Sequence, residues 1–217
     1  ADFWINPDQY LEALFIACKN VGVQFYDNLN IVNITETDAL CEIKTDLSIK
    51  FCSKKVVLCA GVGVGKIKIN QDLGEKLYAA PGNTLKQSIE FKDKNICAVK
   101  ELAGAAIYEK NLFLGSTTET NGVTVQGDTA EKLIQTKSPF SEVKQHFEML
   151  WNKVFGSSEL IDFQEDSVRW GVRVRTKSRV PVIKYISEKN KVILNTGYYK
   201  SGLTLTYLGA DQVLELV

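Results

Sequence analysis

A run of basic residues between positions 173 and 179 is the part of this sequence best suited to binding an anion. The cations occupy alternate positions of a strand-like stretch: Arg173, Arg175, Lys177 and Arg179. Side chains two residues apart on a strand point to the same face, so we expect these four to share one. Such a face suits an anionic cofactor or an RNA backbone. The same pattern also describes a sheet edge that charge protects from pairing, and the residues alone leave both interpretations open.

A strand that runs into three spaced glycines is the second candidate for chemistry. The strand covers residues 56–60, and the glycines are Gly61, Gly63 and Gly65. Glycine lets backbone amides approach a phosphate closely. The spacing differs from the G-x-G-x-x-G dinucleotide fingerprint, because its sixth position is Lys66 and no long amphipathic helix follows. We therefore expect no primary dinucleotide site here, and an ordinary strand-to-loop turn is the alternative.

Metal and triad chemistry are disfavoured by the histidine and cysteine content. His146 is the only histidine, and we interpret it as a helix-surface residue. Because the only histidine lies in a stretch with helical spacing, we expect neither a zinc site nor a Ser-His-Asp triad, and no C-x-x-C pair occurs. The cysteines are odd in number and lie among mostly apolar neighbours: Cys18, Cys41, Cys52, Cys59 and Cys97. We interpret them as reduced, mostly buried thiols of a cytoplasmic protein.

Length and composition narrow the class of protein further. A chain of 217 residues with 45% hydrophobic side chains suits one or two folded domains. Its 26 basic and 26 acidic side chains cancel, which argues against a surface that binds nucleic acid everywhere. The apolar runs are only a few residues long, so no membrane span is expected. The chain opens without a signal peptide and directly with a structural element, so we expect a piece of a longer protein.

Apolar residues at helical spacing predict helices near both ends of the chain and in its second half. The first begins after a cap at Asn6, with Pro7 in its first turn, and ends at Gly22. The last runs from about residue 203 to residue 216. The middle helix covers residues 138–155 and has one apolar face: Val143, Phe147, Leu150, Trp151 and Val154.

Short runs of β-branched and aromatic residues predict strands. The expected strands of the first part are 23–26, 31–34, 40–44, 47–51 and 55–60. The last of these lacks alternation, which is typical of a strand buried on both faces of a parallel sheet. A hairpin is expected where 107–108 and 112–114 flank a turn at Lys110-Asn111. Further strands are expected at 167–174, 182–186 and 191–195.

Three segments, taken in order, resemble the FAD-dependent D-amino-acid oxidase superfamily, which includes glycine oxidase and sarcosine oxidase. They are Val-Val-Leu-Cys-Ala-Gly (56–61), Trp-Gly-Val-Arg-Val-Arg-Thr-Lys-Ser-Arg-Val-Pro-Val-Ile (170–183) and Asn-Thr-Gly-Tyr-Tyr-Lys-Ser-Gly-Leu-Thr (195–204). Residues 115–119 are similar to the family's G-A-T-x-E segment, and residues 4–7 to its helix entry. The resemblance covers nearly the whole chain but only the carboxy-terminal part of the family's usual length. The family's amino-terminal G-x-G-x-x-G is absent.

This resemblance implies a mixed α/β (α+β) fold in two domains. Residues 1–72 and 188–217 would be the remnant of a Rossmann-like FAD-binding domain. Residues 73–187 would form an antiparallel-sheet-dominated, D-amino-acid-oxidase-like substrate-binding domain. Strands 56–60 and 192–194, which both precede glycine turns, should then share one sheet. Because the main pyrophosphate site is absent, we expect the 217 residues alone to be inactive and nearly colourless.

The resemblance also implies FAD as the cofactor and assigns the site residues. The cofactor contacts would be Ile31, Ala60, Gly61, Tyr199, Lys200, Ser201, Gly202, Leu203 and Thr204. Residues 199–204 would face the flavin, and the backbone of Ile31 would hold the adenine. Arg173 matches the family's catalytic, substrate-binding arginine, whose planar guanidinium forms two parallel bonds to a carboxylate. Tyr108 is the candidate for a second substrate contact.

The function implied is that of an FAD-dependent oxidoreductase that oxidises the C–N bond of a glycine-like amine or amino acid by hydride transfer to flavin. Residues 171–181 and 201–204 also resemble the flavin domain of the bifunctional tRNA wobble-uridine modification enzyme. That domain oxidatively removes a carboxymethyl group from an aminomethyl uridine, so tRNA is the alternative substrate. A non-catalytic domain that lacks its flavin-binding half is a further alternative. The exact amine, the electron acceptor and the oligomeric state stay open.

Overall fold

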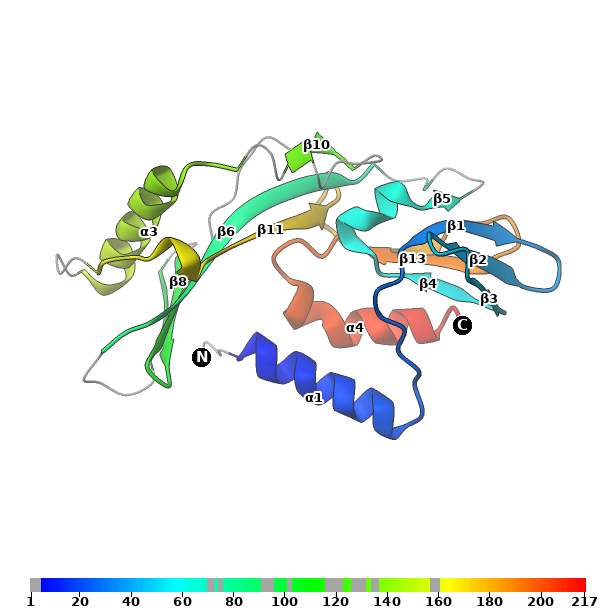
Figure 1. Cartoon of the computed structure of the whole chain (residues 1–217), viewed down its shortest axis with the longest axis horizontal. Coiled ribbons are helices and arrows are strands. Elements are labelled where there is room, and N and C mark those ends of the chain that lie inside the picture. The colour runs from blue at the N-terminus through cyan, green and yellow to red at the C-terminus, as the bar shows by residue number, and fades with distance from the viewer. Residues whose placement is uncertain are drawn as a thin grey trace. The chain divides into compact units, whose positions relative to one another are not determined.

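The computed structural model describes residues 5–69, 73, 76–90, 96–100, 103–115, 123–125, 132–133, 137–156 and 161–217 (Figure 1). Residue contacts divide the chain into two compact units. One consists of Ala1–Asn28, Asn83–Thr117 and Ser138–Trp170, and the other of Leu29–Gly82, Thr118–Lys137 and Gly171–Val217. This division differs from the predicted domains, which stay a prediction. The predicted fold class, a mixture of helices with several sheets, is confirmed.

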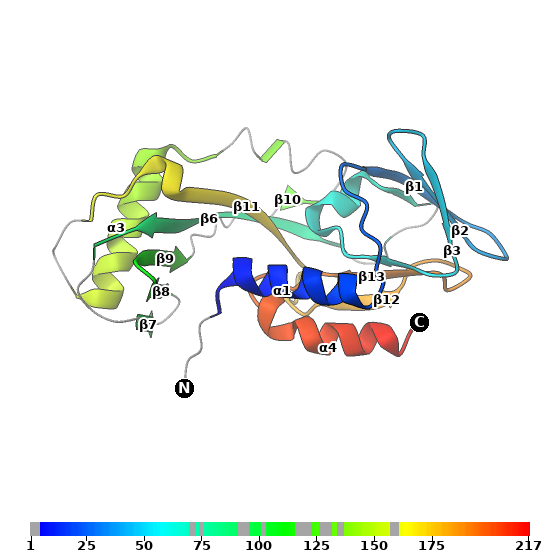
Figure 2. The same cartoon turned by 60° about the horizontal axis from the view of Figure 1, so that its bottom comes forward.

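The first unit packs a helix on an antiparallel sheet. Its strands are β7 (Ile96–Lys100), β8 (Ala103–Tyr108) and β9 (Asn111–Gly115), and β9 pairs with the later part of β6 (Tyr78–Ser88). Helix α3 (Phe140–Phe155) lies against these strands (Figure 2). Their apolar faces meet in one core: Leu85, Ala105, Ile107, Leu112, Leu114, Val143, Phe147, Leu150, Trp151 and Phe163. The predicted face of this helix is confirmed, because burial of such a stripe holds a helix on a sheet.

Helix α1 (Pro7–Asn20) begins and ends as predicted. The side chain of Asn6 accepts hydrogen bonds from the backbone amides of Asp8 at 3.1 Å and Gln9 at 3.4 Å. Gly22, with φ of 87°, follows the last turn, because a left-handed backbone there suits glycine. None of the helix residues is buried. The first unit also holds the short 3-10 helix η2 (Glu165–Ser167).

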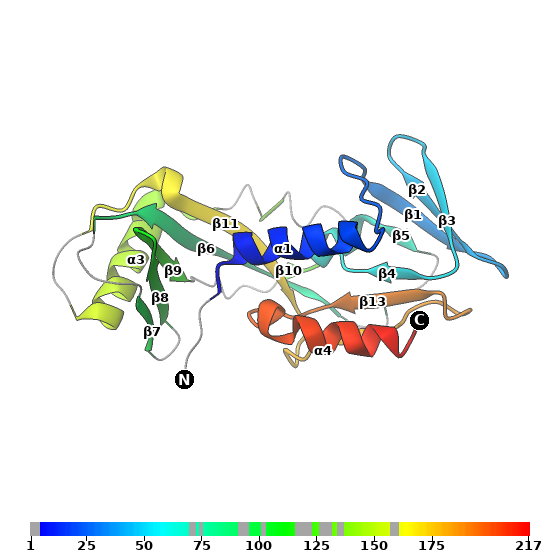
Figure 3. The ribbon, with the colours of Figure 1, turned by 90° about the horizontal axis from the view of Figure 1, so that it is seen from below.

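The second unit contains two further sheets. A four-stranded sheet has the order β3-β2-β1-β5, made from β1 (Ile31–Glu36), β2 (Cys41–Thr45), β3 (Lys50–Ser53) and β5 (Lys68–Ile69). A three-stranded sheet has the order β12-β13-β4, made from β12 (Val182–Tyr185), β13 (Val192–Thr196) and β4 (Val56–Leu58). Helix α4 (Gly202–Leu214) contacts β12 and β13 and runs beside β13 (Figure 3). The 3-10 helix η1 (Gly61–Lys66) follows β4.

Two long strands complete the topology. β6 belongs to a six-stranded sheet of order β10-β6-β9-β8-β7, and β11 (Val168–Arg175) pairs with β6 off this path. The short β10 (Val123–Thr124) pairs with Tyr78 and Ala79. Among the described residues, no helix has both the length and the apolar character that crossing a membrane requires.

Four local predictions are wrong, each for a physical reason. Residues 23–26 form a loop rather than a strand, and the ring of Phe25 packs on Phe15 of α1 with centroids 4.5 Å apart. The strand predicted at 47–51 begins only at Lys50, because Thr45 and Ile49 close a turn at 3.0 Å. The strand predicted at 55–60 is shorter and not buried on both faces, since Val57 is 37% exposed.

The fourth wrong prediction concerns the position of the hairpin turn. It lies at Glu109-Lys110, one residue earlier than predicted, and Tyr108 pairs with Asn111 across it. Both turn residues have positive φ, 48° and 63°, which matches the right-handed twist of a two-residue hairpin.

The cysteine interpretation also needs correction. Cys41 is buried and Cys18 half-buried, but Cys52, Cys59 and Cys97 are exposed, so the thiols are not mostly buried. All of them are free. His146 is half-buried on α3, and its burial lowers the pKa of the imidazole. The helix position predicted for it is therefore right, although the side chain is less exposed than expected.

Candidate functional site

The two glycine turns of the sequence meet at one edge of the three-stranded sheet. β4 and β13 are parallel neighbours, with Val56 opposite Val192 and Leu58 opposite Leu194. This confirms the prediction that the two strands share a sheet. Carboxyl ends of parallel strands lie at the same edge, which is where ligands bind in open α/β sheets. The turn after β4 (residues 59–61) and the turn after β13 (residues 197–201) therefore lie side by side, and we call them the first and second turn.

The second turn leads into helix α4, whose amino-terminal end has no side-chain cap. Gly197 has φ of 85°, a backbone conformation that favours glycine, and a Cβ there would lie close to Cγ2 of Thr176, at 3.3 Å. The amide of Tyr199 donates to the Val174 carbonyl at 3.0 Å, and that of Ser201 to the Tyr198 carbonyl at 2.9 Å. No side chain caps the amino-terminal end of α4, at Gly202 to Thr204. Its amides suit a ligand with acceptor atoms and partial negative charge.

Cations surround the ring of Tyr199, which itself has φ of 53°. The guanidinium of Arg173 on β11 lies over this ring at 5.6 Å, and that of Arg179 at 5.8 Å. The ammonium of Lys200 lies 5.6 Å from the same ring. Arg173 is half-buried, and burial lowers its pKa while Tyr199 opposes the shift. An arginine stays protonated nevertheless, so this side chain presents a partly desolvated cation.

The prediction that four cations share one strand face is only partly right. β11 ends at Arg175, whose guanidinium lies over the ring of Tyr78 at 5.1 Å, not over Tyr199. The chain then turns, because the hydroxyl of Thr176 donates to the Val180 carbonyl at 2.9 Å and Arg179 has φ of 64°. The turn, rather than strand alternation, places Arg179 with Arg173. Lys177 is exposed.

The first turn carries Ala60 and Gly61, which were predicted to contact the cofactor. Ala60 is exposed and precedes η1, and Gly61 has φ of 54°. A Cβ on Gly63 would meet only ordinary contacts, so within this glycine cluster it is Gly61 whose positive φ favours glycine. Ile31, the other predicted contact, begins β1 and lies in the four-stranded sheet instead.

Tyr108, the predicted second substrate contact, lies elsewhere in the topology. It ends β8, and its hydrogen bond with Glu109 raises the pKa of the phenol. It belongs to the first unit and Arg173 to the second, so their meeting at one site stays a prediction.

Sequence reasoning missed a cluster behind the second turn. The hydroxyl of Tyr198 donates to Oδ1 of Asn195 at 2.6 Å. Gly209 of α4 lies under the Tyr198 ring. A glycine inside a predicted helix is the signal that could have revealed this close approach.

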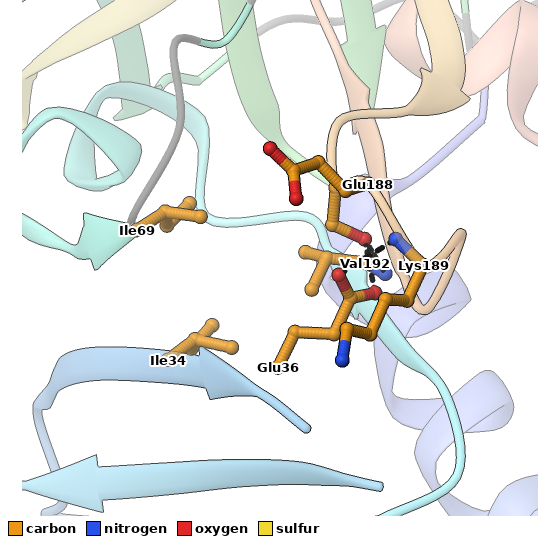
Figure 4. Close-up of a pocket in the computed structure, with 7 residues that line it drawn as sticks. Ile34, Glu36, Ile69, Glu188, Lys189 and Val192 are labelled. Atoms are coloured by element: carbon orange, nitrogen blue, oxygen red, sulfur yellow. Dashed lines mark hydrogen bonds between the residues drawn. The ribbon is translucent and has the colours of Figure 1, made fainter. Parts of the chain in front are cut away.

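A cavity lies between β1, β5 and the β12–β13 turn (Figure 4). Ile34, Ile69 and Val192 form its apolar wall, and Glu36, Glu188 and Lys189 its polar one. The Glu36 carboxylate already accepts from the Ser187 hydroxyl at 2.6 Å and from the Lys189 and Lys191 amides, both at 2.8 Å. These hydrogen bonds occupy the carboxylate oxygens and stabilise the β12–β13 turn. Among the described residues, no group of three or more histidine, cysteine, aspartate or glutamate side chains is placed to hold a metal ion.

Comparisons with known proteins bear on the whole chain. A family model described as FAD dependent oxidoreductase (DAO) matches residues 1–216. Amadoriase I, a fructosyl amine:oxygen oxidoreductase from Aspergillus fumigatus, aligns with TM-score 0.74 at 15% identity over 98% of this chain and 52% of its own. Glycine oxidase from Geobacillus kaustophilus aligns with TM-score 0.70 at 15% identity over 94% and 52%.

Iminodiacetate oxidase from Chelativorans sp. BNC1 aligns with TM-score 0.70 at 14% identity, over 95% of this chain and 55% of its own. No curated protein matches. The chain therefore shares the fold of these oxidases and spans about half of their length.

Proposed function

We propose, from the premise that this chain belongs to the DAO family of FAD-dependent oxidoreductases, that it carries the flavin-facing and substrate-facing part of an amine oxidoreductase. The reaction would be oxidation of the C–N bond of a glycine-like amine or amino acid. The observation that carries this proposal is the meeting of both glycine turns at one sheet edge, with Arg173 beside the second.

The residues at this edge fit FAD. The uncapped amino-terminal end of α4 offers amide donors to an acceptor edge of a flavin ring. The positive end of the helix dipole favours negative charge there. Gly61, with its positive φ, lets the first turn approach a ligand closely. Residues 199–204 and 60–61 would thus hold the cofactor, and Ile31 stays a predicted adenine contact. When bound, a flavin accepts the hydride from the carbon next to the substrate nitrogen.

Arg173 would bind and orient the substrate carboxylate. Its guanidinium is half-buried and lies over the Tyr199 ring, and its planar shape lets two of its nitrogens donate in parallel to a carboxylate. A carboxylate held by two parallel bonds leaves only the adjacent carbon and nitrogen free to face the flavin. Tyr108 is kept as a proposed second contact.

A carboxymethylaminomethyl uridine in tRNA is the second candidate substrate. Arg179 and Lys200 are both exposed and lie at the same ring as Arg173, so the positive charge extends beyond what one carboxylate needs. Such an extension favours a larger anionic substrate with a phosphate backbone. We also keep the cytoplasmic location as part of the proposal.

The test is anaerobic mixing of flavin-loaded protein with candidate amines. The 217-residue chain and the full product of its gene are each purified and their flavin absorbance measured. We expect the 217 residues alone to be nearly colourless. Glycine, sarcosine and tRNA carrying the modified uridine are then added to the yellow form, and bleaching of the flavin by one of them supports the proposal.

Two results would overturn it. A flavin that none of these amines bleaches would refute the substrate class. Absence of flavin from both proteins would refute the cofactor and favour the non-catalytic alternative.

A further inference from the structure

We propose that Arg179 is a specificity-determining residue of the candidate site and recognises a second anionic group on the amine substrate. Its role rests on the function proposed above, in which Arg173 binds the carboxylate next to the oxidised C–N bond. The second group would be a further carboxylate or a phosphate, on a part of the substrate that does not react. Arg179 would therefore select among amines without taking part in the oxidation.

The part of the chain that carries Arg173 and the second turn has a strong excess of positive charge. Residues 168–210 contain nine basic side chains and one acidic side chain, Glu188, although the whole chain has a net charge of zero. Glu188 lies in the turn after β12, whereas Arg179 lies in the loop before β12, so the strand separates them. An anion would thus meet a positive field at the Arg179 end of this strand.

Three cations gather at the ring of Tyr199, and two of them have no acidic partner. The charged groups of Arg173, Arg179 and Lys200 lie 5.6, 5.8 and 5.6 Å from the ring centroid. No acidic side chain in the described part of the chain forms an ion pair with Arg179 or Lys200. Because like charges gathered at one ring repel each other, the cluster favours an anionic ligand. One carboxylate at Arg173 would leave the charge of Arg179 unmatched.

A closed loop holds the backbone of Arg179 in place. The hydroxyl of the buried Thr176 donates to the Val180 carbonyl at 2.9 Å, and the Thr176 carbonyl accepts from the Arg179 amide at 3.4 Å. The hydroxyl oxygens of Thr176 and Ser178 lie 3.1 Å apart. Arg179 has φ of 64°, a left-handed conformation that is unfavourable for residues other than glycine. The loop hydrogen bonds therefore set the direction in which the Arg179 side chain leaves the backbone.

The same loop packs on the second turn. A Cβ on Gly197 would lie 3.3 Å from Cγ2 of Thr176, so the two segments touch at this point. The Tyr199 amide donates to the Val174 carbonyl at 3.0 Å, just before the loop begins. These contacts fix Arg179 and Tyr199 relative to each other through the backbone, as a residue that discriminates between ligands requires.

Arg179 suits this role better than Lys200. Lys200 follows Tyr199 directly and is one of the residues proposed to hold the cofactor. Arg179 comes from a different loop, and its planar guanidinium can form two parallel bonds to a carboxylate or a phosphate. Arg179 is exposed and Arg173 is half-buried. The exposed side chain is therefore the one available to an outer substituent of a substrate whose reacting end lies at Arg173.

The experiment measures equilibrium binding of paired ligands to the purified chain and to the flavin-loaded full gene product. N-(2-carboxyethyl)glycine and N-propylglycine have equally long carbon tails, and only the first tail is anionic. Carboxymethylaminomethyl uridine and its 5′-monophosphate form a second pair, which differs in a phosphate. The anionic member of at least one pair should bind more tightly than its partner. Arg179→Gln should weaken that member by about tenfold, the effect of losing a charge-assisted bond at an exposed site, and leave its partner unchanged.

The matched control is Lys177→Gln, which removes the same charge from the same loop. Lys177 is exposed and should affect neither pair. An equal loss in Lys177→Gln, or an equal loss for both members of a pair in Arg179→Gln, would show a general field effect and overturn the proposal. No preference for an anionic member in the wild-type protein would overturn it as well. A preference within the first pair identifies a carboxylate as the second group, and one within the second pair a phosphate.

Flavin content and bleaching decide the proposed function separately. If a glycine-like amine bleaches the flavin but Arg179→Gln changes no preference, the proposed function stands and the role of Arg179 fails. If the full gene product holds no flavin, the proposed function fails, and the binding preference alone decides whether Arg179 recognises an anion.

Discussion

The hydroxyl group of Tyr198 lies directly against Gly209 in helix α4. A Cβ on Gly209 would lie 2.0 Å from that oxygen and 2.9 Å from Cζ, distances that no packed side chain tolerates. The glycine is therefore what lets the second turn dock on the helix. The same tyrosine donates to Asn195, so one ring links the end of β13 to the middle of α4.

Gly209→Ala should destabilise the protein by about 1–3 kcal/mol, because the methyl group forces the Tyr198 ring to move. Alanine in place of glycine inside a helix ordinarily stabilises by roughly 0.5–1 kcal/mol, so the expected sign is reversed. Urea unfolding measures the change. In a Tyr198→Phe background the penalty should shrink, since the closest atom is gone, and a stabilising Gly209→Ala would show that the contact is absent.

Arg173→Ala in the flavin-loaded enzyme should lower kcat/KM by about two to three orders of magnitude. Charge-assisted hydrogen bonds are worth roughly 1.5–3 kcal/mol each, and the variant leaves the substrate carboxylate without its partner. Arg173→Lys should recover only part of the loss, because an ammonium lacks the planar fork. Flavin content should stay the same.

A matched control for Arg173 is Arg169→Ala on the same strand. Arg169 is exposed, lies 3.5 Å from Asp8, and should leave turnover unchanged, since exposed ion pairs contribute little. Normal turnover of glycine, sarcosine and modified tRNA by Arg173→Ala would remove Arg173 from the site.

Glu36→Gln should remove a stabilising contribution that the Glu36 carboxylate makes only above the acidic pH range. Although burial raises the pKa of Glu36, hydrogen bonds from Ser187, Lys189 and Lys191 outweigh it and hold the pKa below the ordinary value of 4.5. A carboxylate with a lowered pKa stabilises the fold above its unfolded pKa, and this part is lost as pH falls through the folded pKa.

The variant should therefore be less stable than wild type at pH 7, by about 1–2 kcal/mol given the partial exposure of the group. The difference should shrink as the pH falls below about 4.5. Urea unfolding at a series of pH values is the measurement. A difference that does not change with pH would contradict the role of the charge.

Thiol labelling of the native protein should separate the cysteines by exposure. Cys41 is fully buried, and burial together with the nearby Glu36 charge raises its thiol pKa, so it should react only after unfolding. Cys52 and Cys97, which are exposed, should react readily and serve as internal controls. Mass spectrometry of alkylated peptides reads each site, and native labelling of Cys41 as fast as Cys52 would show that this core is open.

Much of the local structure followed from the sequence alone. The cap at Asn6, the buried face of α3 and the two strands that end in glycine turns were all predictable, because spacing and backbone preference report on the faces and ends of one element. The family also followed, since its motifs are local runs of residues in a fixed order.

The arrangement of the candidate site was decided by tertiary structure. Alternation predicted four cations on one face, but the turn at Thr176 brings Arg179 to Tyr199 and leaves Arg175 at Tyr78. The position of the turn after Leu58 beside the turn after β13 depends on the parallel pairing of two strands that lie far apart in the chain. Periodicity describes where a side chain points on its own element. Which side chains meet depends on where the chain reverses and on which strands pair with each other. The spacing of nearby residues predicts neither of these.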